Sequence, residues 1–366
     1  MINGEFKRSF IKFRNRTRRI YYVFKNEEEP SGLIHYPYKN LVFKGGGIRG
    51  LAYAGALEVL EKNNILQQIE RVAGTSAGAI TAMLVSLRLS FTDTLATLHT
   101  LDHTKVPQTR INTTKTSEII NSLGLRNGDL VCTNRMLNEF GWYSSLYFYE
   151  WLQETIAKFC DGNGKATFSD FKDKGFRDLF IVASNLSKHR AELFSYETTP
   201  NVAVADAVRM SMSIPFFFQA LRFDGKTFGQ GDIYIDGGLY DNFPIQLFDN
   251  PKYAKQNPWY IHGINWETLG CYLYPYRSEE ELEKDPKTLR EYLVLTLDNI
   301  FDAFQMMSYE NSEIDKKRTI KINDCGISPI EFNIPIHSDR YYELINSGRN
   351  AATQFLNEDF PNEIFT

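Results

Sequence analysis

The chain has few of the residues that build disulfide scaffolds, metal centres or membrane spans. Its 366 residues include four cysteines and six histidines, with no C-x-x-C pair and no Cys/His cluster at metal-ligand spacing. We therefore expect the cysteines to be reduced packing residues: Cys132, Cys160, Cys271 and Cys325. No run reaches the roughly 18 apolar residues that a membrane-spanning helix needs, and the N-terminus lacks an apolar signal core. These absences predict a cytoplasmic protein, although export without a cleaved signal is compatible with them.

The charge of the chain is unevenly distributed. The whole chain carries a net charge of −4, whereas residues 1–25 contain eight Lys or Arg residues and one Glu. Aromatic and aliphatic residues alternate with these cations, a mixture that suits an anionic membrane surface. The alternatives are an arm that pairs with the chain's own acidic surface and a poorly ordered terminus. Nucleic-acid binding is not expected, because the rest of the chain has no basic stripe.

A glycine turn, Gly45-Gly46-Gly47-Ile48-Arg49-Gly50, follows a short apolar stretch at residues 40–44 that predicts a buried strand. A helical pattern begins at Leu51, so the turn lies at a helix N-terminus, where free backbone N–H groups favour an anion. An oxyanion and a nucleotide phosphate both suit this geometry. The phosphate interpretation is disfavoured because no Gly-Lys-Ser/Thr follows the turn. A simple tight turn is the third interpretation.

A second turn, Gly74-Thr75-Ser76-Ala77-Gly78, has the G-x-S-x-G form. A predicted strand at residues 68–73 precedes it, and an apolar helix at residues 79–85 follows. In this context the motif raises a serine hydroxyl on a sharp turn, where it can act as a nucleophile. Gly74 and Gly78 let the turn tighten and let the helix pack closely.

A serine nucleophile needs a base to take its proton. None of the six histidines lies in a motif. Asp236, in contrast, ends the alternating stretch at residues 232–235 and is followed by Gly237 and Gly238. A carboxylate is a weak base, so this assignment requires that burial raise its proton affinity. The structural alternative is that Asp236 only caps a turn.

Taken together, these motifs resemble the patatin-like phospholipase family, which is related to calcium-independent phospholipases A2. The matching residues are Gly45–Gly50 for G-G-G-x-R/K-G, Gly74–Gly78 for G-x-S-x-G and Asp236–Gly238 for D-G-G/A. Residues 211–215 (S-M-S-I-P), 241–244 (D-N-F-P) and 344–352 match further family blocks. The resemblance extends from about residue 38 to 357.

The resemblance implies a three-layer α/β/α fold with a mostly parallel central sheet. It also implies that Ser76 attacks an acyl ester of a membrane phospholipid and that Asp236 accepts the serine proton. The loop Gly45–Gly50 would form the oxyanion hole, in which Gly45, Gly46, Gly47, Arg49 and Gly50 are the assigned residues; the N–H groups of Gly46 and Gly47 would hold the oxyanion, and Arg49 would support the loop. The resemblance implies no metal and no cofactor, and it identifies no activating partner.

The predicted domain organisation is a basic arm at residues 1–37, a patatin-like phospholipase domain at 38–357 and a tail at 358–366. Two aromatic segments, residues 137–159 and Phe216-Phe217-Phe218, are interpreted either as walls of an acyl-chain pocket or as core. An acidic loop and an amphipathic helix within residues 279–307 suggest either a lid or a core helix.

Three functional alternatives remain beside a lipid acyl hydrolase of the phospholipase A or lysophospholipase type. One is an α/β-hydrolase esterase with a triad of Ser76, Asp236 and either His262 or His337. Another is an acyltransferase, because an acyl-enzyme can pass its acyl group to an alcohol. The last is a catalytically silent lipid-binding scaffold.

Overall fold

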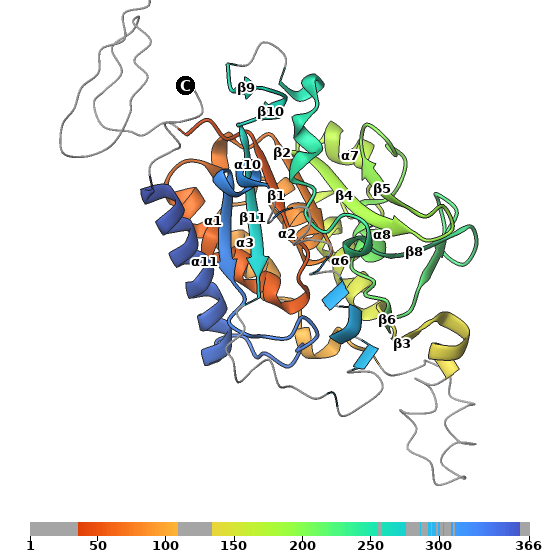
Figure 1. Cartoon of the computed structure of the whole chain (residues 1–366). Coiled ribbons are helices and arrows are strands. Elements are labelled where there is room, and N and C mark those ends of the chain that lie inside the picture. Colours follow the sequence, from red (N-terminus) through yellow and green to blue (C-terminus); the bar gives the residue numbers. More distant parts are fainter. Residues whose placement is uncertain are drawn as a thin grey trace, which may run out of the picture.

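The computed structural model describes residues 36–108, 134–254, 258–275 and 312–358, together with isolated residues between 286 and 309. Figure 1 shows a central sheet with helices packed against it. The sheet has eight strands in the order β12-β11-β1-β2-β4-β8-β7, with β5 on the other edge of β4. β12, β11, β1, β2 and β4 run parallel, whereas β5, β7 and β8 make antiparallel pairs.

The strands of this sheet are β1 (Asn40–Phe43), β2 (Arg71–Thr75), β4 (Asp178–Asn185), β5 (Arg190–Ser195), β7 (Leu221–Phe223), β8 (Asp232–Asp236), β11 (Thr268–Tyr274) and β12 (Thr319–Asn323). Two small two-stranded sheets pair β3 (Gly141–Tyr143) with β6 (Phe216–Phe218) and β9 (Tyr260–Ile261) with β10 (Ile264–Asn265).

The central strands are buried on both faces, which explains their continuous apolar sequences. In β1, the side chains of Leu41 and Phe43 belong to the larger core cluster, and Val42 between them belongs to a second cluster on the opposite face. Successive side chains point to opposite faces of a strand, so each central strand contributes to both layers of core.

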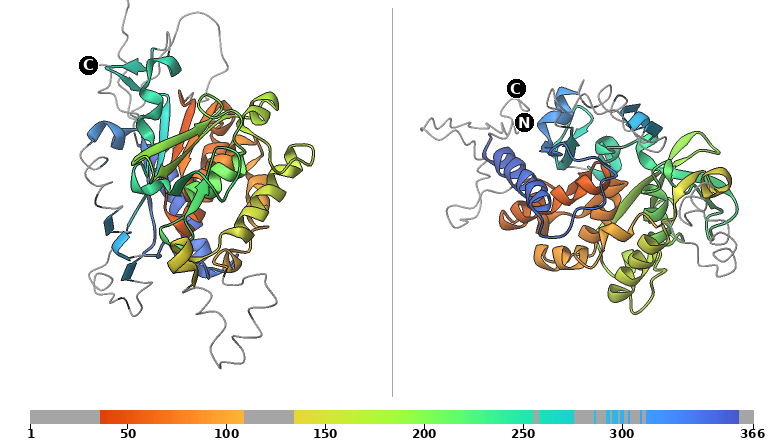
Figure 2. Two further views of the ribbon diagram at one scale, coloured as in Figure 1. Left: turned by 90° about the vertical axis from the view of Figure 1, so that its right-hand side faces the viewer. Right: turned by 90° about the horizontal axis from the view of Figure 1, so that it is seen from below.

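Helices pack against the sheet, and most of them contribute side chains to the larger core cluster. They are α1 (Ala52–Lys62), α2 (Ala77–Ser86), α3 (Phe91–Leu98), α6 (Leu146–Phe159), α7 (Phe168–Asp173), α8 (Val204–Ser211), α10 (Glu313–Lys317) and α11 (Asp339–Asn357). The C-terminal helix α11 packs along α1, as the right-hand view of Figure 2 also shows. Two 3₁₀ helices, Ile245–Asp249 and Pro251–Tyr253, supply apolar side chains to the second cluster.

This arrangement confirms the predicted α/β/α class with a mostly parallel sheet. The strands expected at residues 40–44, 68–73 and 232–235 are all present, and no end is shifted by more than three residues. The closing helix is also confirmed, and the Ser338 hydroxyl caps it by accepting a hydrogen bond from the Tyr341 N–H.

Several expectations concern parts of the chain that the structure does not describe. Residues 1–35 of the basic arm lie outside the described residues, as do Cys132, most of residues 279–307 and residues 359–366 of the tail. Cys160 and Cys271 are buried free thiols, and Cys325 is a half-buried free thiol. None of the described helices is long and apolar enough to cross a bilayer.

Candidate active site

The sheet brings Ser76 and Asp236 together along one edge of β4. β5 occupies one edge of residues 180–185 of β4, so β2 and β8 must both pair with the other edge. Thr75, the last residue of β2, pairs with Val182, and Asp236, the last residue of β8, pairs with Ala183. Because β8 runs antiparallel to β4, the carboxyl ends of β2 and β8 meet head to head.

Ser76 occupies a strained backbone conformation at this meeting point. Its φ of 54° and ψ of −124° lie in a region that non-glycine residues rarely adopt. α2 begins at the next residue, so the positive end of the helix dipole lies at the serine. The Ser76 N–H donates to the Ser211 hydroxyl at 2.9 Å, and that hydroxyl donates to the Val182 carbonyl at 2.6 Å. These contacts hold the turn on β4.

Asp236 is positioned by three hydrogen bonds. The Ser76 hydroxyl donates to Oδ2 at 2.5 Å, and the Gly238 N–H donates to Oδ1 at 2.8 Å. The Asp236 N–H donates to the Ser213 carbonyl at 2.8 Å. Ser76 is 4% exposed and Asp236 is 3% exposed. Burial raises the pKa of Asp236 from 3.8 to about 7, although the hydrogen bonds from Ser76 and Gly238 oppose this shift.

The first glycine turn lies against the serine. A Cβ atom on Gly45 would lie 3.1 Å from the Cβ of Ser76, and one on Gly50 would lie 2.9 Å from the Cβ of Ala77. The Gly45 N–H donates to the Asn242 carbonyl at 3.0 Å. In the described part of the chain, the N–H groups of Gly46 and Gly47 have no acceptor.

A buried ion pair and a neighbouring loop hold this turn in place. Arg49 Nε donates to the Gly46 carbonyl at 2.9 Å, and Arg49 Nη1 pairs with Asp324 Oδ2 at 2.9 Å. Gly47 has a φ of +58°, and a Cβ there would lie 2.0 Å from the Pro329 carbonyl oxygen. Only glycine fits this position. The loop is therefore fixed before any ligand binds.

The glycines of the other two motifs lie where backbones approach each other closely. A Cβ on Gly74 would lie 2.2 Å from the Gly78 carbonyl oxygen, and one on Gly78 would lie 2.3 Å from the Phe43 carbonyl oxygen. α2 can therefore pack directly on β1 and β2. A Cβ on Gly237 would lie 2.3 Å from the Val182 carbonyl oxygen, whereas Gly238 supplies the N–H that binds Asp236.

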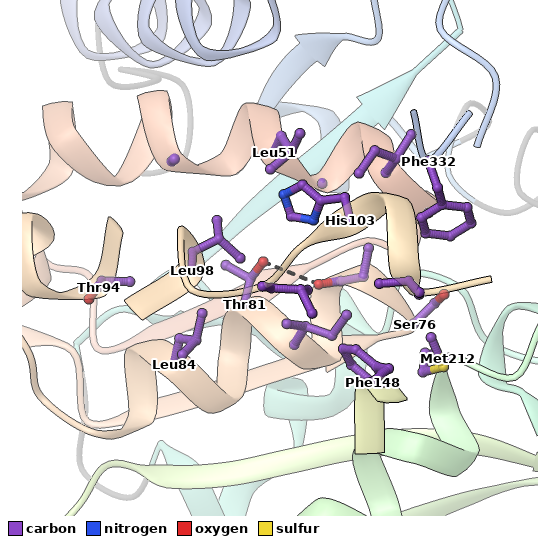
Figure 3. A pocket seen from close by; sticks show the side chains of 18 of the residues that line it. Leu51, Ser76, Thr81, Leu84, Thr94, Leu98, His103, Phe148, Met212 and Phe332 are labelled. Carbon is purple, nitrogen blue, oxygen red and sulfur yellow. Dashed lines mark hydrogen bonds between the residues drawn. The ribbon is translucent and has the colours of Figure 1, made fainter. Parts of the chain in front are cut away.

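An apolar pocket opens beside Ser76. Figure 3 shows its labelled side chains extending from Ser76 to Leu98 and Thr94. The walls come from separate elements and include Leu51, Leu84, Leu98, Phe148, Met212 and Phe332. Of the two aromatic segments, Phe148 and Phe218 line the pocket, Phe217 is buried in the core, and Phe216 is 39% exposed. Each segment therefore supplies a side chain to the pocket wall, while other side chains of the same segment are buried in the core.

No described histidine hydrogen-bonds to Ser76 or Asp236. His262 lies in the exposed turn between β9 and β10, and His337 Nδ1 pairs with the Tyr342 hydroxyl at 2.9 Å. His103 lines the pocket without a hydrogen bond to either residue. Among the described residues, no group of three or more His, Cys, Asp or Glu side chains could hold a metal ion.

Sequence reasoning assigned no role to several residues that build this site. Ser211 and Ser213 hold Ser76 and Asp236 respectively, and their signal was the S-M-S-I-P block. Asn242 contacts the glycine turn from the D-N-F-P block. Asp324 and Pro329 had no local signal, because they reach the turn only through the fold.

The fold and the site define an α/β/α protein with a buried serine–carboxylate pair that opens on an apolar pocket. The sequence profile of patatin-like phospholipases matches residues 41–249. A probable lipid hydrolase of Invertebrate iridescent virus 6 is 29% identical over 227 residues, covering 61% of this chain and 69% of the viral protein. The uncharacterised protein YqhO of Bacillus subtilis is 32% identical over 256 residues, covering 63% of this chain and 80% of YqhO.

The solved structure of VipD from Legionella pneumophila has a similar fold. The TM-score is 0.51 at 17% sequence identity, over 88% of this chain and 67% of VipD. The profile match covers more than half of the chain, so the chain belongs to the patatin-like phospholipase family. Membership supports lipid hydrolase activity in general.

Proposed function

We propose that this protein is a lipid acyl hydrolase of the phospholipase A or lysophospholipase type, acting through Ser76 and Asp236. The observation that carries the proposal is the 2.5 Å hydrogen bond from the Ser76 hydroxyl to the buried Asp236 carboxylate. The adjoining pocket suits an acyl chain, since aliphatic and aromatic side chains form most of its wall.

The first step is attack of Ser76 Oγ on the ester carbonyl carbon, with transfer of the serine proton to Asp236 Oδ2. A carboxylate near its usual pKa would be a poor acceptor for this proton. Burial raises the pKa of Asp236 to about 7. The carboxylate is then a stronger base toward the serine hydroxyl, and much of it is still ionised near neutral pH. The Gly238 N–H occupies Oδ1, so Oδ2 is directed to the serine.

The negative charge that develops on the carbonyl oxygen needs hydrogen-bond donors. The N–H groups of Gly46 and Gly47 are proposed to supply them, because the loop is already fixed by Arg49 and they have no other acceptor in the described chain. One such donor is typically worth about 10²- to 10³-fold in rate. Gly45 is assigned a supporting role in the loop, since its own N–H donates to the Asn242 carbonyl and is not free for the oxyanion.

Collapse of the tetrahedral intermediate breaks the ester bond. The leaving alcohol takes the proton from Asp236, and the acyl group stays on Ser76 as an ester. Asp236 then deprotonates a water molecule that attacks this ester, and Ser76 regains its proton as the fatty acid leaves. The ester that we assign to these steps is an acyl ester of a membrane phospholipid or lysophospholipid, in keeping with the family to which the chain belongs.

We also propose that residues 1–25, the cationic part of the basic arm, bring the protein to an anionic bilayer surface. The support is its eight cations interleaved with apolar residues, each cation near such a surface being worth about 1 kcal/mol. In a flotation assay, the full chain should float with phosphatidylserine vesicles at low salt but not at high salt. It should not float with phosphatidylcholine vesicles at either salt concentration.

Lipid-product analysis tests the catalytic proposal. Wild type, Ser76→Ala and Asp236→Asn are incubated with phospholipid and lysophospholipid vesicles, and fatty acid release is measured. Both variants should lose at least about 10³-fold in rate. His262→Ala and His337→Ala are the matched controls and should retain activity, because neither side chain contacts the pair.

Each alternative predicts a different result. Loss of hydrolysis in a folded His262→Ala or His337→Ala variant would show a triad and contradict the dyad. Formation of acylated alcohol in place of fatty acid would show an acyltransferase. A folded wild-type protein that forms no Ser76-dependent adduct with a fluorophosphonate probe would be a silent scaffold.

A further inference from the structure

His103 is a polar residue in the wall of an otherwise largely apolar pocket. It begins the 3₁₀ helix His103–Lys105, is 5% exposed, and lines the same pocket as Ser76. Figure 3 shows its imidazole among the pocket side chains, with Leu51 and Phe332 also on the wall. Neither the serine–carboxylate pair nor the glycine turn uses this residue.

The imidazole has an unmet hydrogen-bonding atom. Nε2 of His103 is buried and has no hydrogen-bond partner among the residues that the structure describes. Burial lowers the pKa of His103 to about 4, so the ring is neutral at physiological pH. A neutral imidazole has one N–H donor and one acceptor nitrogen.

Two nearby histidines are hydrogen-bonded. His99 Nε2 pairs with the Tyr341 hydroxyl at 2.7 Å, and His337 Nδ1 pairs with the Tyr342 hydroxyl. A buried polar atom without a partner costs stability, and His103 Nε2 is the one such side-chain atom among the described residues that belongs to a pocket-lining residue. A leucine would fill the position of His103 without this cost. The unpaired Nε2 therefore points to a partner that arrives with the ligand.

We propose that His103 is a specificity residue that hydrogen-bonds an oxygen atom within the substrate's acyl chain, so that the pocket favours oxygenated chains, such as hydroxyacyl chains, over plain ones. This inference rests on the proposed function, in which the pocket holds the acyl chain. A hydroxyl group both donates and accepts, so it can pair with Nε2 in either tautomer of the ring. A methylene group at the same place leaves Nε2 unpaired.

Equilibrium binding of free fatty acids tests the proposal without requiring turnover. Stearic acid and a series of its monohydroxy derivatives, with the hydroxyl at successive mid-chain carbons, compete with a fluorescent fatty acid for the full-length protein. At the matching carbon, wild type should bind the hydroxy acid about three- to tenfold more tightly than stearic acid, the gain expected from one net hydrogen bond.

Three variants separate a hydrogen bond from a change of shape. His103→Leu removes both ring nitrogens and should reverse the preference in favour of stearic acid. His103→Gln keeps a donor and an acceptor and should retain the preference. Leu98→Met changes an apolar wall residue of similar volume and should also retain it, which makes it the matched control.

Several results would overturn the proposal. A wild-type protein that binds every hydroxy acid no more tightly than stearic acid has no such contact, as expected if a trapped water occupies the space. A preference that survives in His103→Leu places the contact elsewhere. Failure to bind any fatty acid would contradict the assignment of the pocket as an acyl-chain site. Failure of the proposed function is recognised separately, as absence of Ser76-dependent hydrolysis of a plain-chain lysophospholipid.

Discussion

At the scale of single residues, the chemistry of the site depends on burial more than on residue type. Serine and aspartate are common surface residues with little reactivity toward esters. Here each is at least 96% buried, and they are joined by a short hydrogen bond. Removing the carboxylate from water disfavours its charged form, which moves its pKa into the range where a general base is useful.

This raised pKa predicts opposite effects of pH on hydrolysis and on stability. In the proposed mechanism hydrolysis requires ionised Asp236, so the rate should rise as pH increases through about 7. The folded protein holds this proton more tightly than the unfolded chain, so stability should fall between about pH 4 and pH 7. The measurements are kcat/KM and the free energy of unfolding across this range.

Asp236→Asn should abolish hydrolysis and also remove this part of the pH dependence of stability. At about pH 8 the variant should be more stable than wild type by up to a few kcal/mol, with the difference disappearing near pH 4. Ser76→Ala is the control, because it loses activity but keeps the buried carboxylate. An Asp236→Asn variant whose stability follows the same pH curve as wild type would contradict the assignment of the pKa.

At the scale of elements, α1 and α11 pack closely against each other beside the glycine turn. α1 follows the turn directly, and α11 also packs on β12. The two helices approach at glycines: a Cβ on Gly55 would lie 1.8 Å from the Ile345 carbonyl oxygen, and one on Gly348 would lie 1.8 Å from the Ala52 carbonyl oxygen. Side chains at these positions must force the helices apart.

Gly55→Ala and Gly348→Ala are therefore expected to destabilise the protein, although alanine is the better helix former. The added methyl group meets backbone, which cannot move aside, so the loss should be about 1–3 kcal/mol or more. Thr353→Ala, at an exposed position of α11, is the control and should change stability by less than about 0.5 kcal/mol. Chemical denaturation measures each value. Equal stability of Gly55→Ala and wild type would show that the helices do not approach so closely.

At the scale of the whole molecule, the sheet extends well beyond the segment that the family profile matches. β11, β12 and α11 all follow residue 249, yet β11 pairs with β1 and α11 packs on α1. β1 leads directly into the glycine turn. We therefore propose that residues 38–357 form one domain, and that the site depends on its C-terminal third.

Truncation tests this domain boundary. A chain ending at residue 249 loses the parallel partner of β1 and the helix that covers α1, so it should show no cooperative thermal unfolding by circular dichroism. A chain ending at residue 358 keeps every described element and should unfold like the full-length protein. Cooperative unfolding of the shorter chain, together with Ser76 labelling by a fluorophosphonate, would show that residues 41–249 suffice.

Local patterns in the sequence were enough to predict most elements and the two principal site residues. Strands at residues 40–44 and 232–235 have apolar or alternating patterns, and Ser76 lies in a motif whose form is set by its neighbours. The direction of β8 was not predictable in this way, because a strand's own sequence does not specify which neighbour it pairs with or in which orientation.

The sequence by itself determined the glycine turn and the strand–turn–helix context of Ser76, since these depend on residues adjacent in the chain, and its resemblance to a known family implied the α/β/α class and the proposed roles of Ser76 and Asp236. Only the tertiary structure decided that these two side chains, 160 residues apart, share a hydrogen bond in a nearly dry site. It also decided that His103, which belongs to no motif, lines the same pocket with an unpaired nitrogen. Burial and pairing depend on contacts between distant segments, and these arise only when the chain folds.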